Sequence, residues 1–202
     1  AGQLPIPLLF ASTGETLTEK SGNLNLGIPG IMYAGGICGV IGAFFYERSL
    51  SSPAEINAFL AVIIPMVCSL AGSLLMGLIY CFLTVTLRAN QNVTGLALTT
   101  FGVGVGNFFG GYLIKIGGSS VASIALSATS ACFRRSLPFA SKLGAFGTVF
   151  LSYSFLAYLA VLVSLVAGIL LRRSRVGLHL RAVGENPGTA DAAGINISRY
   201  KY

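Results

Sequence analysis

Four apolar stretches limit what this chain can fold into. They cover residues 26–46, 58–83, 93–114 and 148–171. A helix needs about 20 apolar residues to cross the hydrocarbon core of a bilayer. Charged residues make up only 9% of the chain, whereas soluble domains carry about 25%. Because so few charges could not solvate a soluble surface, the sequence predicts an all-α polytopic membrane protein with four or more transmembrane helices.

Two shorter apolar stretches lie outside these four spans. The opening LPIPLLFAST, residues 4–13, is too short to span a bilayer alone. It fits either the inner end of a longer helix or a helix that lies in the interface. The stretch SSVASIALSATSA, residues 119–131, is composed of small residues, and we expect a re-entrant or surface helix there.

The net charge of +7 comes from basic residues that flank the apolar stretches, which favours membrane topology over nucleic-acid binding. By the positive-inside rule, the basic end of the chain faces the cytoplasm. The segments around Lys20 and Arg88 then face the same side, and the loops at residues 47–57 and 115–147 face outside. The basic residues at the end of the chain are Arg172, Arg173, Arg175, Arg181, Arg199 and Lys201.

Small residues recur at every fourth position in three of the apolar stretches, so each predicted helix has one smooth face. A neighbouring backbone can approach closely along such a face. General helix packing and a sliding surface for gating both fit this pattern, and the spacing does not separate them. The rows are Gly35, Gly39 and Ala43; Ser69, Ser73 and Gly77; and Gly102, Gly106 and Gly110.

The polar stretch RAVGENPGTADAAGIN, residues 181–196, follows the last apolar stretch. Asn186 suits the N-cap of a helix and Pro187 its first position, while Gly194 suits the left-handed residue that closes a helix. The two turns between them are too short to be stable alone in water. A short capped helix of this kind fits docking into a groove on a partner, or an ordinary loop helix between two spans.

Three stretches carry a resemblance to a known family. GETLTEKSGNLNLGIPGIM, LRANQNVTGLAL and GLHLRAVGENPGTADAAGINISRYKY resemble the permease subunits of bacterial ABC importers for nucleosides and simple sugars, a ribose-permease-like, binding-protein-dependent family. The similarity runs from about Pro5 to Tyr202, except near residues 115–145. Relatives often carry Glu at the position of Pro29. They also continue with further spans, so we interpret residues 1–202 as a transmembrane permease domain that is incomplete at its C-terminus.

The resemblance implies a set of partners and a location. Permeases of this family pair as identical or different subunits in the cytoplasmic (inner) membrane, within the lipid bilayer. Two ABC ATPase subunits drive them, and a substrate-binding lipoprotein or periplasmic receptor delivers the solute. The cytoplasmic segment 172–202 would contain the coupling helix, which fits a groove in the ATPase. The residues that match this helix are Gly184, Glu185, Asn186, Pro187, Ala190, Ala193 and Gly194.

Three asparagines are candidates for the substrate pathway. Asn23 and Asn25 interrupt the apolar pattern just before the first span, among glycines that favour an irregular backbone. Their amides could bond both the donors and the acceptors of a sugar or base, although a plain turn before the helix explains them as well. Asn107 lies in the middle of a span, where a polar side chain usually faces other helices or a cavity.

The sequence therefore predicts a solute-conducting subunit without enzymatic chemistry, cofactor or metal. No Walker motif, no Ser-His-Asp or Cys-His set and no CxxC pair occurs in it, and ATP hydrolysis would belong to the partner. A permease for branched-chain amino acids is the nearest alternative. A secondary transporter or channel is another, but it would call for ionisable groups in the centres of the spans, which the sequence lacks there.

Overall fold

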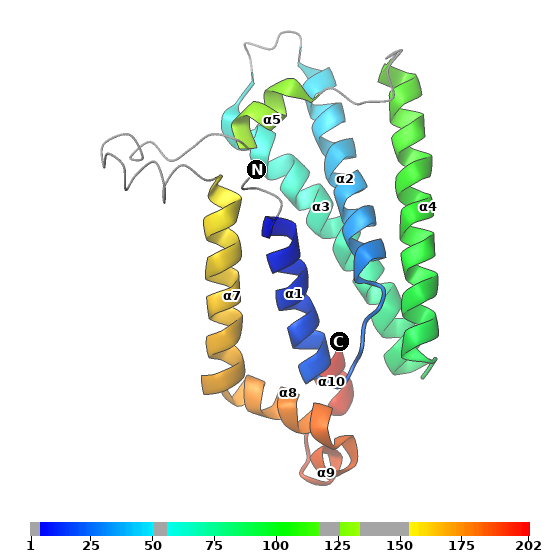
Figure 1. The fold of residues 1–202 in the computed structure, drawn as a ribbon, viewed down its shortest axis with the longest axis vertical. Helices are drawn as coiled ribbons and strands as arrows, with labels where there is room; N and C mark the ends of the chain where they lie inside the picture. Colours follow the sequence, from blue (N-terminus) through cyan, green and yellow to red (C-terminus); the bar gives the residue numbers. More distant parts are fainter. Residues whose placement is uncertain (1–4, 51–55, 118–125, 134–153) are drawn as a thin grey trace, which may run out of the picture. The chain divides into compact units, whose positions relative to one another are not determined.

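The computed structural model describes residues 5–50, 56–117, 126–133 and 154–202, and within these ranges it is helical without strands (Figure 1). The predicted all-α class is confirmed for this part of the chain. The helices are α1 (Pro5–Lys20), α2 (Ile28–Ser49), α3 (Ala58–Cys81), a π-helical turn (Phe82–Thr86), α4 (Gln91–Gly117), α5 (Ser127–Phe133), α7 (Phe155–Arg173), α8 (Arg175–Glu185), α9 (Pro187–Ala192) and α10 (Ile197–Lys201).

Four helical stretches are long and apolar enough to cross a membrane: Ile28–Ser49, Ala58–Thr86, Gln91–Gly117 and Phe155–Arg173. They match the four predicted spans, with ends that shift by a few residues. The first begins at Ile28 rather than residue 26 because Pro29 occupies the first turn, where its missing N–H costs nothing. For the fourth, residues 148–153 lie outside the described residues.

α1 reaches beyond the opening apolar stretch and continues through polar residues to Lys20. Its 16 residues correspond to about 24 Å at 1.5 Å per residue, which is short of a bilayer core. Hydroxyl groups on this helix donate to carbonyls one turn earlier, as Thr13 does to Leu9 at 2.7 Å and Thr16 to Ser12 at 2.8 Å. These bonds satisfy the hydroxyls within the helix itself. Of the second short stretch, residues 127–131 belong to α5, which continues to Phe133, and residues 119–125 lie outside the described residues.

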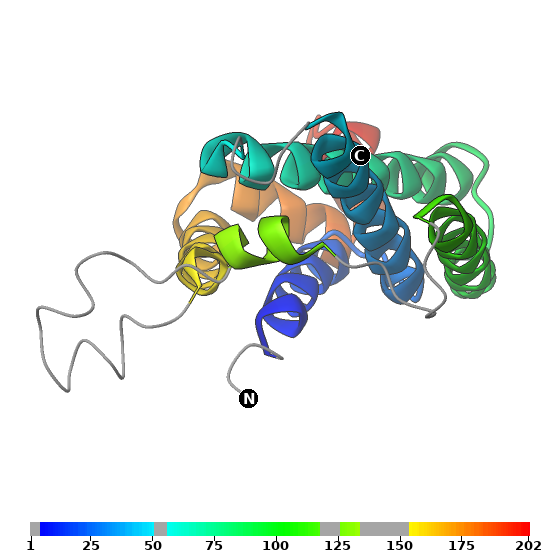
Figure 2. The same ribbon diagram turned by 90° about the horizontal axis from the view of Figure 1, so that it is seen from above.

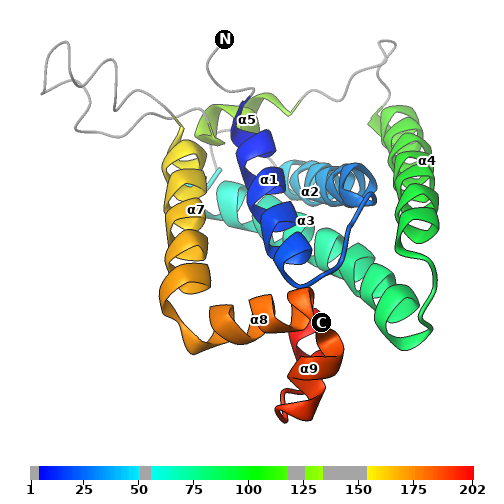
Figure 3. The ribbon, with the colours of Figure 1, turned by 60° about the horizontal axis from the view of Figure 1, so that its bottom comes forward.

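The chain divides into two compact units. The first unit contains α1, the turn Cys81–Val93 and helices α7 to α10, and the second contains α2, α5 and nearly all of α3 and α4. In the first unit α1 packs beside α7 (Figure 1). Thr13 and Ser164 share a hydrogen bond of 2.8 Å between the two helices, and Ala160 is fully buried. α8 leaves the lower end of α7 at a sharp angle, and α9 lies below α8 (Figure 3). α10 packs against α8 and α9.

In the second unit α2 lies between α3 and α4 (Figure 2), and small residues form both contacts. A Cβ atom built on Gly39 would lie 3.2 Å from the Pro65 carbonyl oxygen of α3, and one on Gly35 would collide with the Ser73 hydroxyl. A Cβ on Gly102 of α4 would lie 2.6 Å from the Gly30 Cα of α2. Large apolar side chains such as Leu74 and Phe108 are about two-thirds exposed, at 66% and 71%. This distribution, with small residues at the helix contacts and many large apolar ones exposed, suits helices packed in lipid.

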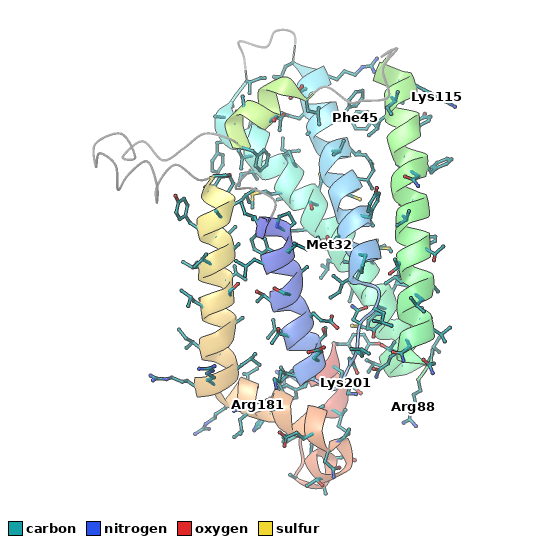
Figure 4. The ribbon with its side chains drawn as sticks, in the orientation of Figure 1. Met32, Phe45, Arg88, Lys115, Arg181 and Lys201 are labelled. Carbon is teal, nitrogen blue, oxygen red and sulfur yellow. The ribbon has the colours of Figure 1, made fainter. Side chains whose placement is uncertain are left out.

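Polar contacts join α2, α4 and α5 at the end of the second unit that is predicted to face outside. The Arg48 guanidinium donates to the Ile116 carbonyl at 3.4 Å, which links the ends of α2 and α4. The Glu47 carboxylate accepts from the Thr129 backbone N–H at 2.7 Å, which links α2 to α5. Lys115 lies in the last turn of α4 (Figure 4). The segments predicted to form the two outer loops therefore meet at one end of this unit.

Candidate coupling site

Three polar caps set the course of the chain after α7. The Ser174 hydroxyl accepts from the Gly177 N–H at 3.0 Å and begins α8. The Asn186 side chain accepts from the Thr189 N–H at 3.1 Å and begins α9, with Pro187 in its first turn. The Asn196 side chain accepts from the Arg199 N–H at 3.1 Å and begins α10. Each cap satisfies a backbone donor that a helix leaves free at its start.

The end of α9 also follows the prediction made from its residues. Gly194 has φ of +80°, a left-handed conformation that costs a non-glycine residue energy. Its N–H donates to the Asp191 carbonyl at 2.8 Å, and the Ile195 N–H donates to the Ala190 carbonyl at 3.0 Å. Asn186, Pro187 and Gly194 thus hold the capping places that the sequence predicts, and α9 is a closed helix of two turns.

The seven candidate coupling residues divide by exposure. Five are exposed and available to a partner: Glu185, Asn186, Pro187, Ala193 and Gly194. Ala190 is only 3% exposed and packs inward. Gly184 is half-buried, because it lies against the end of α1. Gly188, Thr189, Asp191 and Ala192 are exposed too, so α9 is exposed along its whole length except at Ala190. Ala190 and Gly184 hold the helix to the rest of the unit.

Gly184 makes a very close backbone contact with the end of α1. A Cβ built on it would collide with the Lys20 carbonyl oxygen and would lie 3.0 Å from the Gly22 nitrogen. Gly22 has φ of +79° and faces Gly184 in return, with a built Cβ 3.0 Å from the Gly184 Cα. The sequence pattern around residues 22–30 predicts only an irregular backbone at Gly22. Its contact with Gly184 depends on residues 162 positions apart (184 − 22), which no local pattern reveals.

Asn23 is buried, with 3% of its surface exposed, and its side-chain oxygen accepts two hydrogen bonds. One comes from the Lys201 ammonium at 3.1 Å and the other from the Gln91 amide at 3.2 Å. Gln91 in turn accepts from the Leu24 N–H at 2.9 Å. Lys201 is a functional candidate that the sequence reasoning missed. Gln91 could be read from the sequence as a pathway residue or a helix cap, but its bonds to residues 23 and 24 could not. The three segments predicted to share the cytoplasmic side, around residues 20, 88 and 201, are joined by these bonds.

The three pathway candidates lie in different surroundings. Asn25 is 7% exposed, and its N–H donates to the Glu15 carboxylate at 3.3 Å. Asn23 and Asn25 thus share one stretch of the first unit. Asn107 is in the second unit and is exposed, next to the buried Gly106. The role of all three in a substrate pathway stays a prediction.

His179 of α8 holds α10 in place. Its Nδ1 lies 2.8 Å from the Tyr200 hydroxyl, and the two rings meet edge to face with centroids 5.5 Å apart. Tyr202 and Thr86 share a further hydrogen bond, which ties the end of the chain to the turn before α4. Among the residues that the structure describes, no three His, Cys, Asp or Glu side chains gather as a metal site would require.

The N-cap of α9 yields a direct test of this geometry. Replacing Asn186 with Ala removes the acceptor for the Thr189 N–H, at a cost of about 1 kcal/mol. We expect about fivefold faster hydrogen exchange at residues 189–193 by mass spectrometry, because about 1 kcal/mol corresponds to roughly that factor. Asn186→Asp keeps an acceptor at the same place and should exchange as the wild type does. Equal exchange in Asn186→Ala and the wild type would contradict the capping role.

Comparison with known proteins places this chain among transport proteins. A guanosine ABC transporter permease of Bacillus subtilis is 26% identical over 199 residues, which is 97% of this chain and 58% of that protein. A nucleoside ABC transporter permease of Lactococcus lactis is 29% identical over 197 residues, 97% of this chain and 58% of its own length. A Haloferax volcanii protein assigned as a glucose ABC transporter permease is 29% identical over 195 residues, 96% of this chain and 53% of that protein.

The chain thus spans little more than half the length of the curated relatives it matches. No solved structure shows a significant match. The model of the family described as the permease component of branched-chain amino acid transport systems matches residues 4–202. The resemblance found in the sequence is thereby confirmed over nearly the whole chain, and the chain belongs to this permease family.

Proposed function

We propose that this chain is part of the permease subunit of an ATP-driven importer that moves a nucleoside or simple sugar across the bacterial inner membrane. The observation that carries the proposal is α9, a two-turn helix capped by Asn186 and Gly194 at the polar end of a membrane protein. A helix this short gains stability from the surfaces it packs on rather than from its own hydrogen bonds. The guanosine, nucleoside and glucose permeases among its relatives support the choice of solute.

In the proposed mechanism α9 docks into a groove of an ABC ATPase subunit, and ATP hydrolysis takes place in that partner. The permease itself performs no chemistry and needs no cofactor. Closure of the two ATPase subunits pushes the segment 172–202, and the spans rock between outward-open and inward-open states. The glycine faces of α2 and α4 provide close contacts along which such rocking can occur. A second permease subunit completes the path, and a lipoprotein or periplasmic receptor delivers the solute.

Two alternatives make different demands on the chain. A branched-chain amino acid permease would use the same scaffold, and the name of the matching family favours it as the second candidate. A secondary transporter or channel would couple to ions through ionisable groups within the spans. In the described spans such groups stand only near the ends, at Glu47, Arg48, Lys115, Arg172 and Arg173. Coupling through a soluble ATPase is the better fit.

Capture of the ATPase tests the proposal. Ala193 is exposed at the end of α9, with an ordinary φ of −82°, so Ala193→Arg adds bulk and charge without backbone strain. We expect the tagged full-length wild type to co-purify with an ABC ATPase, and Ala193→Arg to reduce this capture at least tenfold. Ala89→Arg is the matched control, because Ala89 is exposed in the turn before α4. Undiminished capture by Ala193→Arg, or no ATPase with the wild type, would reject the role of α9.

A solute panel then identifies the cargo. Cells that express the full-length permease with its partners are supplied with labelled guanosine, ribose, glucose or leucine, and initial uptake is compared with cells that lack the permease. Uptake of guanosine or a sugar supports the proposal. Uptake of leucine alone moves the assignment to the branched-chain amino acid alternative.

A further inference from the structure

We propose that the α1–α2 loop, residues 21–27, is the joint that carries movement of the coupling segment to the starts of α2 and α4, with Asn23 as its positioning residue. The inference rests on the proposed function, because it concerns how force from α9 reaches the spans. It differs from the sequence-based prediction, in which Asn23 lines the substrate pathway. The contacts that carry it lie within the first unit.

The chain just before α9 touches this loop through backbone atoms. Gly184 precedes the α9 cap by two residues (186 − 184). A Cβ built on Gly184 would lie 3.0 Å from the Gly22 nitrogen, and one on Gly22 would lie 3.0 Å from the Gly184 Cα. Because a Cβ would hardly fit at either glycine, the two backbones have no side chain between them that could change rotamer and absorb a displacement. A shift of the end of α8 is therefore passed to Gly22.

The chain after α9 holds the same loop from α10. The Lys201 ammonium donates to the Asn23 side-chain oxygen at 3.1 Å, and only 3% of the Asn23 surface is exposed. Figure 4 shows Lys201 at the lower end of α1. A bond with a charged donor is stronger than a neutral one. Residues on both sides of α9 therefore contact the loop: Gly184 before it packs against Gly22, and Lys201 after it bonds Asn23.

The α1–α2 loop is connected to the starts of two further helices, α4 and α2. Gln91 is the first residue of α4, and it bonds the loop twice: its amide donates to the Asn23 oxygen at 3.2 Å, and its oxygen accepts from the Leu24 N–H at 2.9 Å. The loop itself continues within a few residues into α2, which begins at Ile28. A displacement at Asn23 thus has a bonded route to α4 and a covalent route to α2.

The chemistry of position 23 follows from these contacts. One side-chain oxygen accepts from both Lys201 and Gln91, which uses its two lone pairs. Aspartate offers acceptors of the same shape and adds charge opposite Lys201, so Asn23→Asp keeps the joint. Leucine has the same branched side chain of four heavy atoms, somewhat larger, but no acceptor, so Asn23→Leu opens the joint and leaves two partly buried donors without their bond. Lys201→Met removes the α10 contact alone.

The joint is tested in the assembled transporter, reconstituted in liposomes. The transported probe is guanosine, ribose, glucose or leucine, chosen as the one that the wild type imports. The readout is solute moved per ATP hydrolysed. We expect this ratio to fall about tenfold in Asn23→Leu and Lys201→Met, the scale of one hydrogen bond to a charged group. ATPase capture should stay at the wild-type level, and Asn23→Asp should keep the wild-type ratio. Asn92→Leu and Lys115→Met are the matched controls, since both residues are exposed.

Two results would overturn the inference. One is an unchanged ratio in Asn23→Leu. The other is a loss of transport in strict proportion to a loss of ATPase capture, which would reduce Asn23 to a support of the coupling helix. A purely structural role would lower stability but would not separate hydrolysis from transport.

Hydrogen exchange tests the joint without transport. In the full assembly, Asn23→Leu should raise exchange about tenfold at the Leu24 amide and across residues 197–202, and Lys201→Met should raise it at Leu24. If Asn23→Leu leaves residues 197–202 as protected as in the wild type, the joint does not exist. If the wild type imports no probe but this reciprocal exchange is seen, the proposed function fails and the mechanical link between α10 and the loop stands.

Discussion

Gly30→Ala and Gly102→Ala are expected to separate α2 from α4 and to destabilise the protein more than any other single methyl addition in the second unit. A Cβ on Gly30 would lie 2.6 Å from the Thr99 Cα, and one on Gly102 would lie 2.6 Å from the Gly30 Cα. These neighbours are backbone atoms, which no rotamer change can move aside. Added atoms in a packed interior cost about 1–3 kcal/mol and occasionally more. We expect each variant at the upper end, about 3 kcal/mol.

Thermal unfolding of the purified protein in lipid nanodiscs measures this loss. A loss of about 3 kcal/mol corresponds to roughly 6–12 °C for a chain of this size. Gly36→Ala and Gly104→Ala are matched controls in the same two helices, because a Cβ on either glycine meets nothing within 4 Å. Alanine favours a helix over glycine by about 0.5–1 kcal/mol, so both controls should melt at or above the wild-type temperature. Equal melting of Gly30→Ala and Gly36→Ala would show that α2 and α4 are not in this contact.

Gly184→Ala is expected to disturb the first unit and the coupling segment together. The added methyl would collide with the Lys20 carbonyl oxygen and would approach the Lys20 carbonyl carbon and the Gly22 nitrogen to 3.0 Å. To make room, the end of α8 must move away from α1, and α9 moves with it. We expect a loss of about 2–3 kcal/mol by the same overpacking argument, together with a severe loss of transport.

Melting temperature and solute uptake are compared between Gly184→Ala and two control glycine-to-alanine variants. Gly168→Ala in α7 adds a methyl with nothing within 4 Å, and Gly188→Ala in α9 meets only the Asn186 side-chain oxygen at 3.4 Å. Both should keep the wild-type melting temperature and uptake, whereas Gly184→Ala should lose several degrees and most of its uptake. A normal melting temperature with normal uptake in Gly184→Ala would disprove the backbone contact between α8 and the α1–α2 loop.

Local patterns in the sequence determined the helical spans and the shape of α9. Hydropathy over about 20 residues is enough to define a span, because each helix must satisfy its own backbone bonds in lipid. The ends shifted by a few residues where a single side chain decides, as at Pro29. Asn186, Pro187 and Gly194 predicted the caps of α9 because capping involves residues only three or four positions apart.

The tertiary structure alone decided which of these elements meet. Nothing near Asn23 in the sequence points to Lys201, 178 positions away, or to Gln91, 68 positions away. Likewise, the glycine spacing marked Gly102 as a packing residue but did not name Gly30 as its neighbour. A helix face or a cap is a property of a few consecutive residues, whereas a contact depends on how distant segments are brought together, and only the folded chain contains that information.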